Sequence, residues 1–255
     1  MKKLFLLFLL AVPFWSYAQE ESLIFESNTL TPMPSQVLRF EAAVAAHNKK
    51  YHAAGPHGVR VYEIISGKNA GRYQWVMGPG HWGDLDTRPA DTANHSVDWA
   101  ANVLPNLAVD QNTLYISIDT KRSHFGHDFN ISKIFFYYWD LKPEADMEKV
   151  NALLDKVHKV HAEKLPNEIM GIYRNELPST SEGKDVIMAF FFDKYAWMGI
   201  DNGFDKKFEE VYGKDSWKTF MAEWNAQVKG LESEIWEYRE DLSGLPPKVL
   251  AADRK

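Results

Sequence analysis

Residues 78–84, with the sequence GPGHWGD, form the most unusual segment of the chain. Three glycines and one proline favour a tight turn directly after a predicted strand, and such a turn would hold His81 and Trp82 at the rim of the fold. There an imidazole beside an aromatic ring could give an apolar molecule both burial and one polar partner. We therefore predict a ligand-binding site at His81 and Trp82. The competing interpretation is an ordered turn in which Trp82 only covers the core.

Three aromatic residues on predicted strands, Tyr62, Trp75 and Tyr173, are expected to line the same cavity. Their rings could stack on an apolar ligand, although ordinary aromatic core packing would explain the same residues. We predict that the whole set binds a ligand in preference to catalysing a reaction. The expected partner is an apolar or aromatic small molecule.

Two groups of histidines have the residue types of a metal site. His158 and His161 are three residues apart on a predicted helix, but His161 lies on the apolar stripe and no carboxylate stands at a matching position. His124, His127 and Asp128 share a loop, yet metal sites need three or four converging ligands. We interpret the first pair as core or helix-end residues and the second group as an exposed linker. No metal site is predicted.

The sequence contains none of the compact motifs that would identify a reaction. It has no P-loop, Rossmann glycine pattern, nucleophile-elbow serine or His-Glu-x-x-His pair, and the lack of cysteine excludes a cysteine nucleophile. Most hydrolase, kinase and dehydrogenase interpretations are therefore disfavoured. No catalytic residue and no cofactor is assigned, and the sequence leaves open whether the protein is an enzyme.

The composition, with 45% hydrophobic and 25% charged residues among 255, is that of a globular protein with a substantial core. The formal net charge is -6. A protein that binds a phosphate backbone needs a concentrated field of lysine and arginine, which this charge does not supply. Nucleic acid is therefore not an expected partner.

The first 18 residues have the three parts of a secretory signal peptide: Lys2 and Lys3, an apolar run over residues 4–14, and small residues before Gln19. The run is short for a hydrocarbon core of about 30 Å, so an uncleaved membrane anchor is the weaker alternative. We expect cleavage after Ala18, a periplasmic or secreted protein, and no stable membrane span after cleavage. Loss of the two lysines changes the net charge from -6 to -8.

Hydrophobic periodicity predicts the order strand, helix, strand, strand, helix, strand twice. In the first half we expect strands at 22–30, 59–66, 72–77 and 114–118, and helices at 35–52 and 91–104. In the second half we expect strands at 133–141, 168–177, 185–193 and 232–238, with helices at 143–164 and around 217–228. From this order we predict a first unit at 19–122, a linker at 123–132, a second unit at 133–241 and a flexible tail at 242–255.

Two observations indicate that the halves are related and pack together. Residues 50–53 (KYHA) align with residues 159–162 (KVHA), and Pro34 aligns with Pro143, at the same offset of 109, which indicates an internal repeat. The predicted strand at 133–141 is apolar or aromatic at both alternating sets of positions, so it has two faces to bury. One layer of helices covers one face, and we expect the sheet of the other half to cover the second.

This element order resembles the ferredoxin-like dimeric α+β barrel superfamily, with two βαββαβ units fused in tandem, as in NIPSNAP-like or antibiotic-biosynthesis-monooxygenase-like proteins. The resemblance implies an α+β fold in which the two units form an internal pseudo-dimeric α+β barrel. Such families include cofactor-independent monooxygenases and haem-binding or haem-degrading enzymes, so the fold does not select one chemistry. We expect an exported soluble protein that binds an apolar or aromatic small molecule. A cofactor-independent or haem-dependent monooxygenase-like enzyme is the alternative, and no oligomeric state is assigned.

Overall fold

The computed structural model describes residues 21–87, 94–178 and 183–251. The predicted signal peptide at 1–18 and its cleavage after Ala18 lie outside the described residues. Within the described ranges, no helix combines the length and the hydrophobicity needed to cross a bilayer.

The first half contains four strands and one long helix. The elements are β1 (Ile24–Leu30), α1 (Val37–Tyr51), β2 (Val59–Ile64), β3 (Tyr73–Gly80), the short helix α2 (His95–Asp98) and β4 (Asn112–Ile118). The helix expected at 91–104 is only partly described, and its described part consists of α2, a π-helical turn at Trp99–Val103 and a 3-10 turn at Leu104–Asn106. The buried residues of α1 recur at helical spacing and form one stripe that packs on the core, which favours a helix here. They are Phe40, Val44, His47 and Asn48.

The second half repeats this order with a larger helical layer. Its elements are β5 (Phe129–Asn130), β6 (Lys133–Leu141), α3 (Met147–Lys164), β7 (Met170–Asn175), β8 (Val186–Phe192), α4 (Phe204–Tyr212), α5 (Ser216–Gln227), β9 (Val228–Tyr238) and β10 (Lys248–Val249). α3 begins four residues later than predicted because the carboxylate of Asp146 accepts hydrogen bonds from the backbone N–H groups of Glu148 and Lys149 and caps the helix there. α4 was not predicted from the sequence, and its nine residues lie between Gly203 and Gly213.

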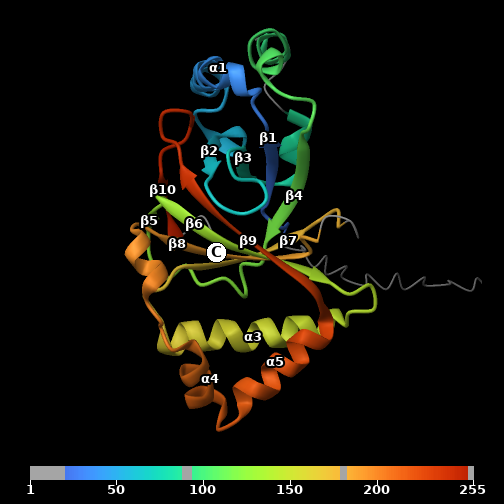
Figure 1. Cartoon of the computed structure of the whole chain (residues 1–255), viewed down its shortest axis with the longest axis vertical. Coiled ribbons are helices and arrows are strands. Elements are labelled where there is room, and N and C mark those ends of the chain that lie inside the picture. The colour runs from blue at the N-terminus through green and yellow to red at the C-terminus, as the bar shows by residue number, and fades with distance from the viewer. Residues whose placement is uncertain (1–20, 88–93, 179–182, 252–255) are drawn as a thin grey trace, which may run out of the picture.

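Eight strands close into one antiparallel barrel, in the order β1-β3-β2-β9-β6-β8-β7-β4. The order within the first half is β4-β1-β3-β2 and within the second half β9-β6-β8-β7, so equivalent strands occupy equivalent places. The pairs β2–β9 and β4–β7 join the halves. The α+β class and the closed barrel agree with the prediction. Figure 1 shows α1 at one end of the molecule and α3, α4 and α5 at the opposite end.

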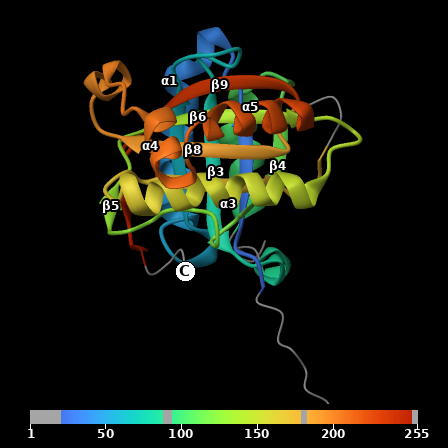
Figure 2. The same ribbon diagram turned by 90° about the horizontal axis from the view of Figure 1, so that it is seen from below.

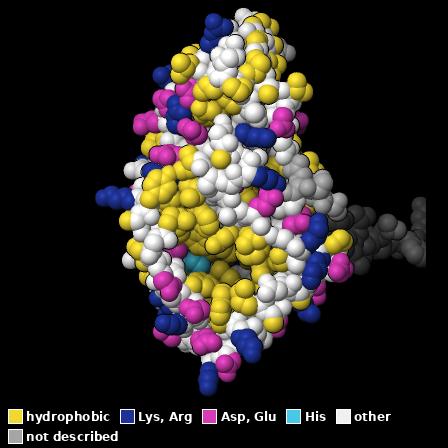
Figure 3. Space-filling model, in the orientation of Figure 1, with side chains coloured by type: hydrophobic (Ala, Val, Ile, Leu, Met, Phe, Trp, Pro, Cys, Tyr) yellow, Lys and Arg dark blue, Asp and Glu magenta, His cyan; other side chains and the backbone are white. Residues whose placement is uncertain are grey.

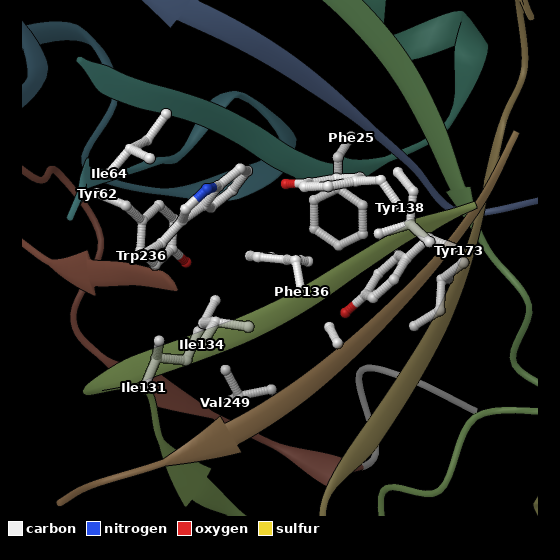
Figure 4. Close-up of a cluster of buried hydrophobic side chains, with 13 residues drawn as sticks. Phe25, Tyr62, Ile64, Ile131, Ile134, Phe136, Tyr138, Tyr173, Trp236 and Val249 are labelled. Carbon is white, nitrogen blue, oxygen red and sulfur yellow. The ribbon is translucent and has the colours of Figure 1, made fainter. Parts of the chain in front are cut away.

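The barrel interior is filled by side chains from both halves (Figure 4). The ring of Phe136 on β6 lies 4.2 Å from that of Trp236 on β9, and the ring of Phe25 on β1 lies 6.0 Å from that of Tyr173 on β7. β6 has the two apolar faces expected of it, because Phe136 points inward while its neighbour Tyr137 points toward the helices. The inner face is therefore buried by the other half of the barrel.

The C-terminal segment was expected as a flexible tail at 242–255, and its described part does not behave as one. Leu242 and Val249 are buried, and β10 pairs with β5. Arg60 on β2 donates hydrogen bonds from Nε to the carbonyl of Pro246 and from a terminal nitrogen to that of Lys248. The segment is ordered because its few apolar side chains and its backbone carbonyls find partners on the barrel.

Candidate functional site

A large cavity lies outside the barrel, between the second half of the sheet and the helices that cover it. Its volume is about 520 Å³, which is in the range of small-molecule sites. Figure 3 shows it as a hollow lined with hydrophobic side chains in the lower half of the molecule. We call it the outer cavity, and its lining consists of Phe135, Tyr137, Trp139, Leu154, Val157, His161, Glu168, Met188, Phe190, Trp197, Met198, Ile200, Asp201, Asn202, Phe204, Trp217, Phe220, Met221, Trp224 and Leu231.

The alternation of the strands and the placement of the helices create this cavity. The outward residues of β6 and β8 are large and apolar, as Trp139 and Phe190 illustrate, and they form the floor. α3 and α5 lie side by side across the sheet in Figure 2, with β8 visible between them. On the helical side, Trp217 and Phe220 of α5 have stacked rings with centroids 5.2 Å apart. The walls are therefore built largely from aromatic planes, which suit a flat apolar molecule.

His161 is the one imidazole in the wall of this cavity, within the described lining. Its Nδ1 lies 3.0 Å from the carbonyl oxygen of Val157 one turn earlier, and because a carbonyl can only accept, Nδ1 carries the proton. Nε2 therefore holds a lone pair, and it is buried without a hydrogen-bond partner among the described residues. Burial lowers the pKa of His161 to about 4, so the ring is neutral at neutral pH. A neutral buried imidazole can accept a hydrogen bond or ligate a metal.

The cavity has one polar corner, near the start of α4. Nδ2 of Asn202 donates a hydrogen bond of 3.0 Å to Oε2 of Glu168, and Asp201 also lines the cavity. Burial raises the pKa of Glu168 above its ordinary value. The charged side chains of the described lining are thus both acidic, which disfavours an anionic ligand at this corner.

The barrel interior holds a second, much smaller cavity of about 60 Å³. Tyr62 and Tyr173 line it, together with buried polar groups such as Gln74, whose Nε2 donates to Oγ of Ser27 over 2.6 Å. A space of this size accommodates a few water molecules and no aromatic ligand. Side chains of both halves thus fill most of the barrel interior.

The five residues predicted to bind a ligand do not share one cavity. Tyr62 and Tyr173 point into the barrel, whereas Trp75 lies on the outer face of β3 beneath α1, where its Nε1 donates a 3.0 Å hydrogen bond to Oδ1 of Asn48. The reason is strand alternation: Tyr62 lies opposite Gln74 in the β2–β3 pair, so the next residue, Trp75, faces the other way. A ligand role for Tyr62 and Tyr173 stays a prediction.

His81 and Trp82 lie at the end of β3, as expected, but outside both cavities. The strand continues through Gly80, three residues further than predicted, because Gly78 adopts a φ of +117° that accommodates an irregularity in the pairing with β1. The ring of Trp82 lies 5.3 Å from that of Tyr115, and Nδ1 of His81 lies 3.6 Å from a carboxylate oxygen of Glu21. Both side chains are partly exposed.

The two histidine groups considered as metal sites do not assemble one within the described residues. The ring of His158 lies 6.2 Å from that of His124, whose Nε2 contacts the carbonyl of Pro166, while His127 is exposed. His161 points elsewhere, into the outer cavity. The helical spacing predicted His161 correctly on the apolar stripe of α3, but it did not predict the cavity that this stripe faces.

The sequence matches no protein-family model and no curated protein. Several solved structures have a similar fold. A proposed monooxygenase from Lactobacillus acidophilus is 13% identical with a TM-score of 0.50, and the match covers 90% of this chain and 100% of that one. A proposed monooxygenase from Fusobacterium nucleatum is 11% identical with a TM-score of 0.55, over 86% and 94% of the two chains.

A chlorite dismutase from Candidatus Nitrospira defluvii, solved in complex with imidazole, is 12% identical with a TM-score of 0.52, over 88% of this chain and 95% of that one. At such low identities the likeness concerns the fold alone. This chain thus shares a fold with these proteins, and its chemistry must be argued from its own residues.

Proposed function

We propose that this protein binds a neutral, largely aromatic small molecule in the outer cavity, with a donor group of the ligand bonded to Nε2 of His161. The buried lone pair of this nitrogen, in a cavity of about 520 Å³ walled by aromatic rings, is the observation that carries the proposal. A buried acceptor without a partner costs about 1–3 kcal/mol, and an O–H or N–H group of a ligand removes that cost on binding. The aromatic walls supply the burial of the rest of the ligand.

The charge of the site favours a neutral ligand that carries a hydroxyl or amine donor. Glu168 and Asp201 are acceptors and repel an anion, while neutral His161 offers no positive charge. A phenol or a polycyclic alcohol fits these constraints, because its ring occupies the apolar space and its hydroxyl faces the imidazole. The residues support binding, and none of them is placed to perform a defined reaction on such a ligand.

Haem is the second candidate, and only the imidazole favours it. Nε2 of neutral His161 could bind haem iron, and a haem held there would supply redox chemistry in this cavity. The acidic corner does not fit the two propionates of haem, since Glu168 and Asp201 are the charged groups of the described lining. Fold similarity to a chlorite dismutase adds no residue-level support.

We also infer that the barrel is an internal pseudo-dimer of two fused ferredoxin-like units and that the protein is exported after cleavage behind Ala18. The repeated strand order β4-β1-β3-β2 and β9-β6-β8-β7 supports the fusion. The charged, apolar and small-residue parts of residues 1–18 support the export.

The test is calorimetric titration of the exported protein with 1-naphthol and with 1-methoxynaphthalene, which has the same rings but no donor. We expect His161→Leu to weaken 1-naphthol binding about fivefold to tenfold, the value of one hydrogen bond, and to leave binding of the methoxy compound within about twofold. His158→Leu, on the same helix but outside the described lining, is the matched control and should change neither affinity.

The proposal is wrong if the wild-type protein binds neither compound, or if His161→Leu affects both equally. A parallel titration with hemin addresses the second candidate. If hemin binds stoichiometrically and its Soret band disappears in His161→Leu, haem replaces the neutral aromatic molecule as the proposed ligand.

A further inference from the structure

Three histidines converge at the other end of the molecule, next to α1. His47 lies in the last turns of α1, His52 follows the end of that helix, and His95 begins α2. One ring nitrogen from each histidine lies within 4.8 Å of one ring nitrogen from each of the other two, and His47 and His52 are almost fully buried. We call these three residues the histidine cluster.

The hydrogen bonds of the cluster determine where two of its lone pairs point. Nδ1 of His52 lies 2.6 Å from the carbonyl of His57, so this nitrogen must carry the proton. Nδ1 of His47 lies 2.7 Å from Oδ2 of Asp98, which accepts its proton in the same way. The opposite nitrogens, Nε2 of His47 and Nε2 of His52, therefore hold lone pairs.

Both lone pairs face the same atom, Nε2 of His95, at 3.2 Å for His47 and 3.1 Å for His52. A single N–H on His95 can point well at only one of them. A metal ion placed between the three Nε2 atoms would be coordinated by all three of them at once. Zinc is bound by histidine at about 2.0–2.1 Å, so two nitrogens at the corners of a zinc tetrahedron are about 3.3 Å apart. The two observed separations are close to this edge length.

We propose that the histidine cluster binds one divalent transition-metal ion, with Zn²⁺ as the ion that its geometry fits best. Asp98 and the carbonyl of His57 orient the imidazoles through their Nδ1 protons, as outer partners do in histidine metal sites. Nitrogen ligands without thiolates suit Zn²⁺, Cu²⁺ and Ni²⁺, and the two separations of 3.2 and 3.1 Å are nearest to the tetrahedral edge length of a zinc site.

The surroundings indicate what such an ion could do. Among the described residues the cluster contains three ligands and no fourth His, Asp or Glu. Three histidines with an open position are typical of catalytic zinc, where a water or a small anion completes the coordination. His95 is half-buried, and the rings of Trp99 and Trp75 close the buried side of the cluster.

The histidine cluster is independent of the outer cavity. It belongs to α1 and α2 in the first half, and the outer cavity lies between the second half of the sheet and α3 to α5, at the opposite end of Figure 1. A ligand in one site shares no lining residue with the other. Either proposal can therefore fail alone.

The experiment is metal titration of the untagged exported protein after removal of metals with a chelator. We expect one equivalent of Zn²⁺ to bind, to raise the unfolding temperature as a ligand of the native state does, and to displace Co²⁺. Bound Co²⁺ should show the visible absorption of a tetrahedral or five-coordinate nitrogen site.

Variants separate a metal site from a hydrogen-bonded histidine network. His95→Ala removes the least buried ligand and should weaken Zn²⁺ binding about 100-fold or more, and Asp98→Asn should weaken it about tenfold through the orientation of His47. His127→Ala removes an exposed histidine and is the matched control. His161→Leu should leave Zn²⁺ binding unchanged. The proposal is overturned if the wild-type protein binds no stoichiometric Zn²⁺. It is also overturned if His95→Ala, folded as judged by circular dichroism, binds Zn²⁺ as tightly as the wild type does.

Discussion

The stability of this protein should fall between neutral and mildly acidic pH because of His161. In the unfolded chain this imidazole titrates near its ordinary pKa of 6.5, whereas burial lowers its pKa in the folded protein to about 4. Between these two values the unfolded state binds a proton that the folded state does not. The free energy of unfolding therefore decreases as pH falls from above 6.5 toward 4, and the loss is complete below the folded-state pKa.

The size of this effect follows from the two pKa values. With 6.5 and about 4, linkage predicts a loss of about 2.5 kcal/mol between about pH 7.5 and about pH 4.5. Because the side chain is only 2% exposed, solvent screening does not reduce this loss. It is a large part of the stability of a typical domain, so it should be measurable against the contributions of the other groups.

The assay is urea unfolding of wild type and His161→Asn at both pH values, with His127→Asn as a control that removes an exposed imidazole. The free energy of unfolding of His161→Asn should depend on pH by about 2.5 kcal/mol less than that of the wild type. Equal pH dependence of the two proteins would refute the reasoning, because it would mean that His161 keeps the same pKa in the folded and unfolded chains.

Other measurements address the barrel, the helix start, the C-terminal segment and the export. Phe136→Ala should lower the free energy of unfolding by about 3–5 kcal/mol, because it leaves a cavity in the barrel interior; Leu38→Ala, at an 81% exposed position, should change it by less than about 0.5 kcal/mol in the same urea assay. Asp146→Ala should cost about 1 kcal/mol by removing the cap of α3, detected as a lower unfolding midpoint. Arg60→Ala should increase amide exchange at β5 and β10, because it removes two hydrogen bonds to the C-terminal segment; unchanged exchange there would contradict the assigned role. Mass spectrometry of exported material should show an N-terminus at Gln19, and retention of Met1 would contradict the signal-peptide prediction.

Local patterns were sufficient to predict most elements of the barrel. The strand at 133–141 was predicted with its observed ends, because the six consecutive β-branched and aromatic residues at 134–139 (IFFYYW) strongly favour a strand. Its two apolar faces also predicted that a second layer would cover the side away from the helices. The start of α3 and the end of β3 were missed because a capping carboxylate and one glycine conformation decided them.

The candidate sites depended far more on the tertiary structure. His161 was predicted on an apolar stripe, which is a local property, but the stripe faces a cavity only because α3, α4 and α5 together enclose a space over the outer face of the sheet. Trp75 and Tyr62 were grouped together as aromatic strand residues, and the pairing register of β2 and β3 separated them.

By itself the sequence determined the α+β class, the repeated order of elements and the burial of both faces of β6, because periodicity and propensity act over neighbouring residues. Only the tertiary structure decided which distant side chains meet. His95 lies 48 residues from His47 and 43 from His52, and the contact exists because the segment after β3 returns to pack α2 against the end of α1. Convergence of this kind depends on how helices pack on a closed barrel, and no local pattern records that packing.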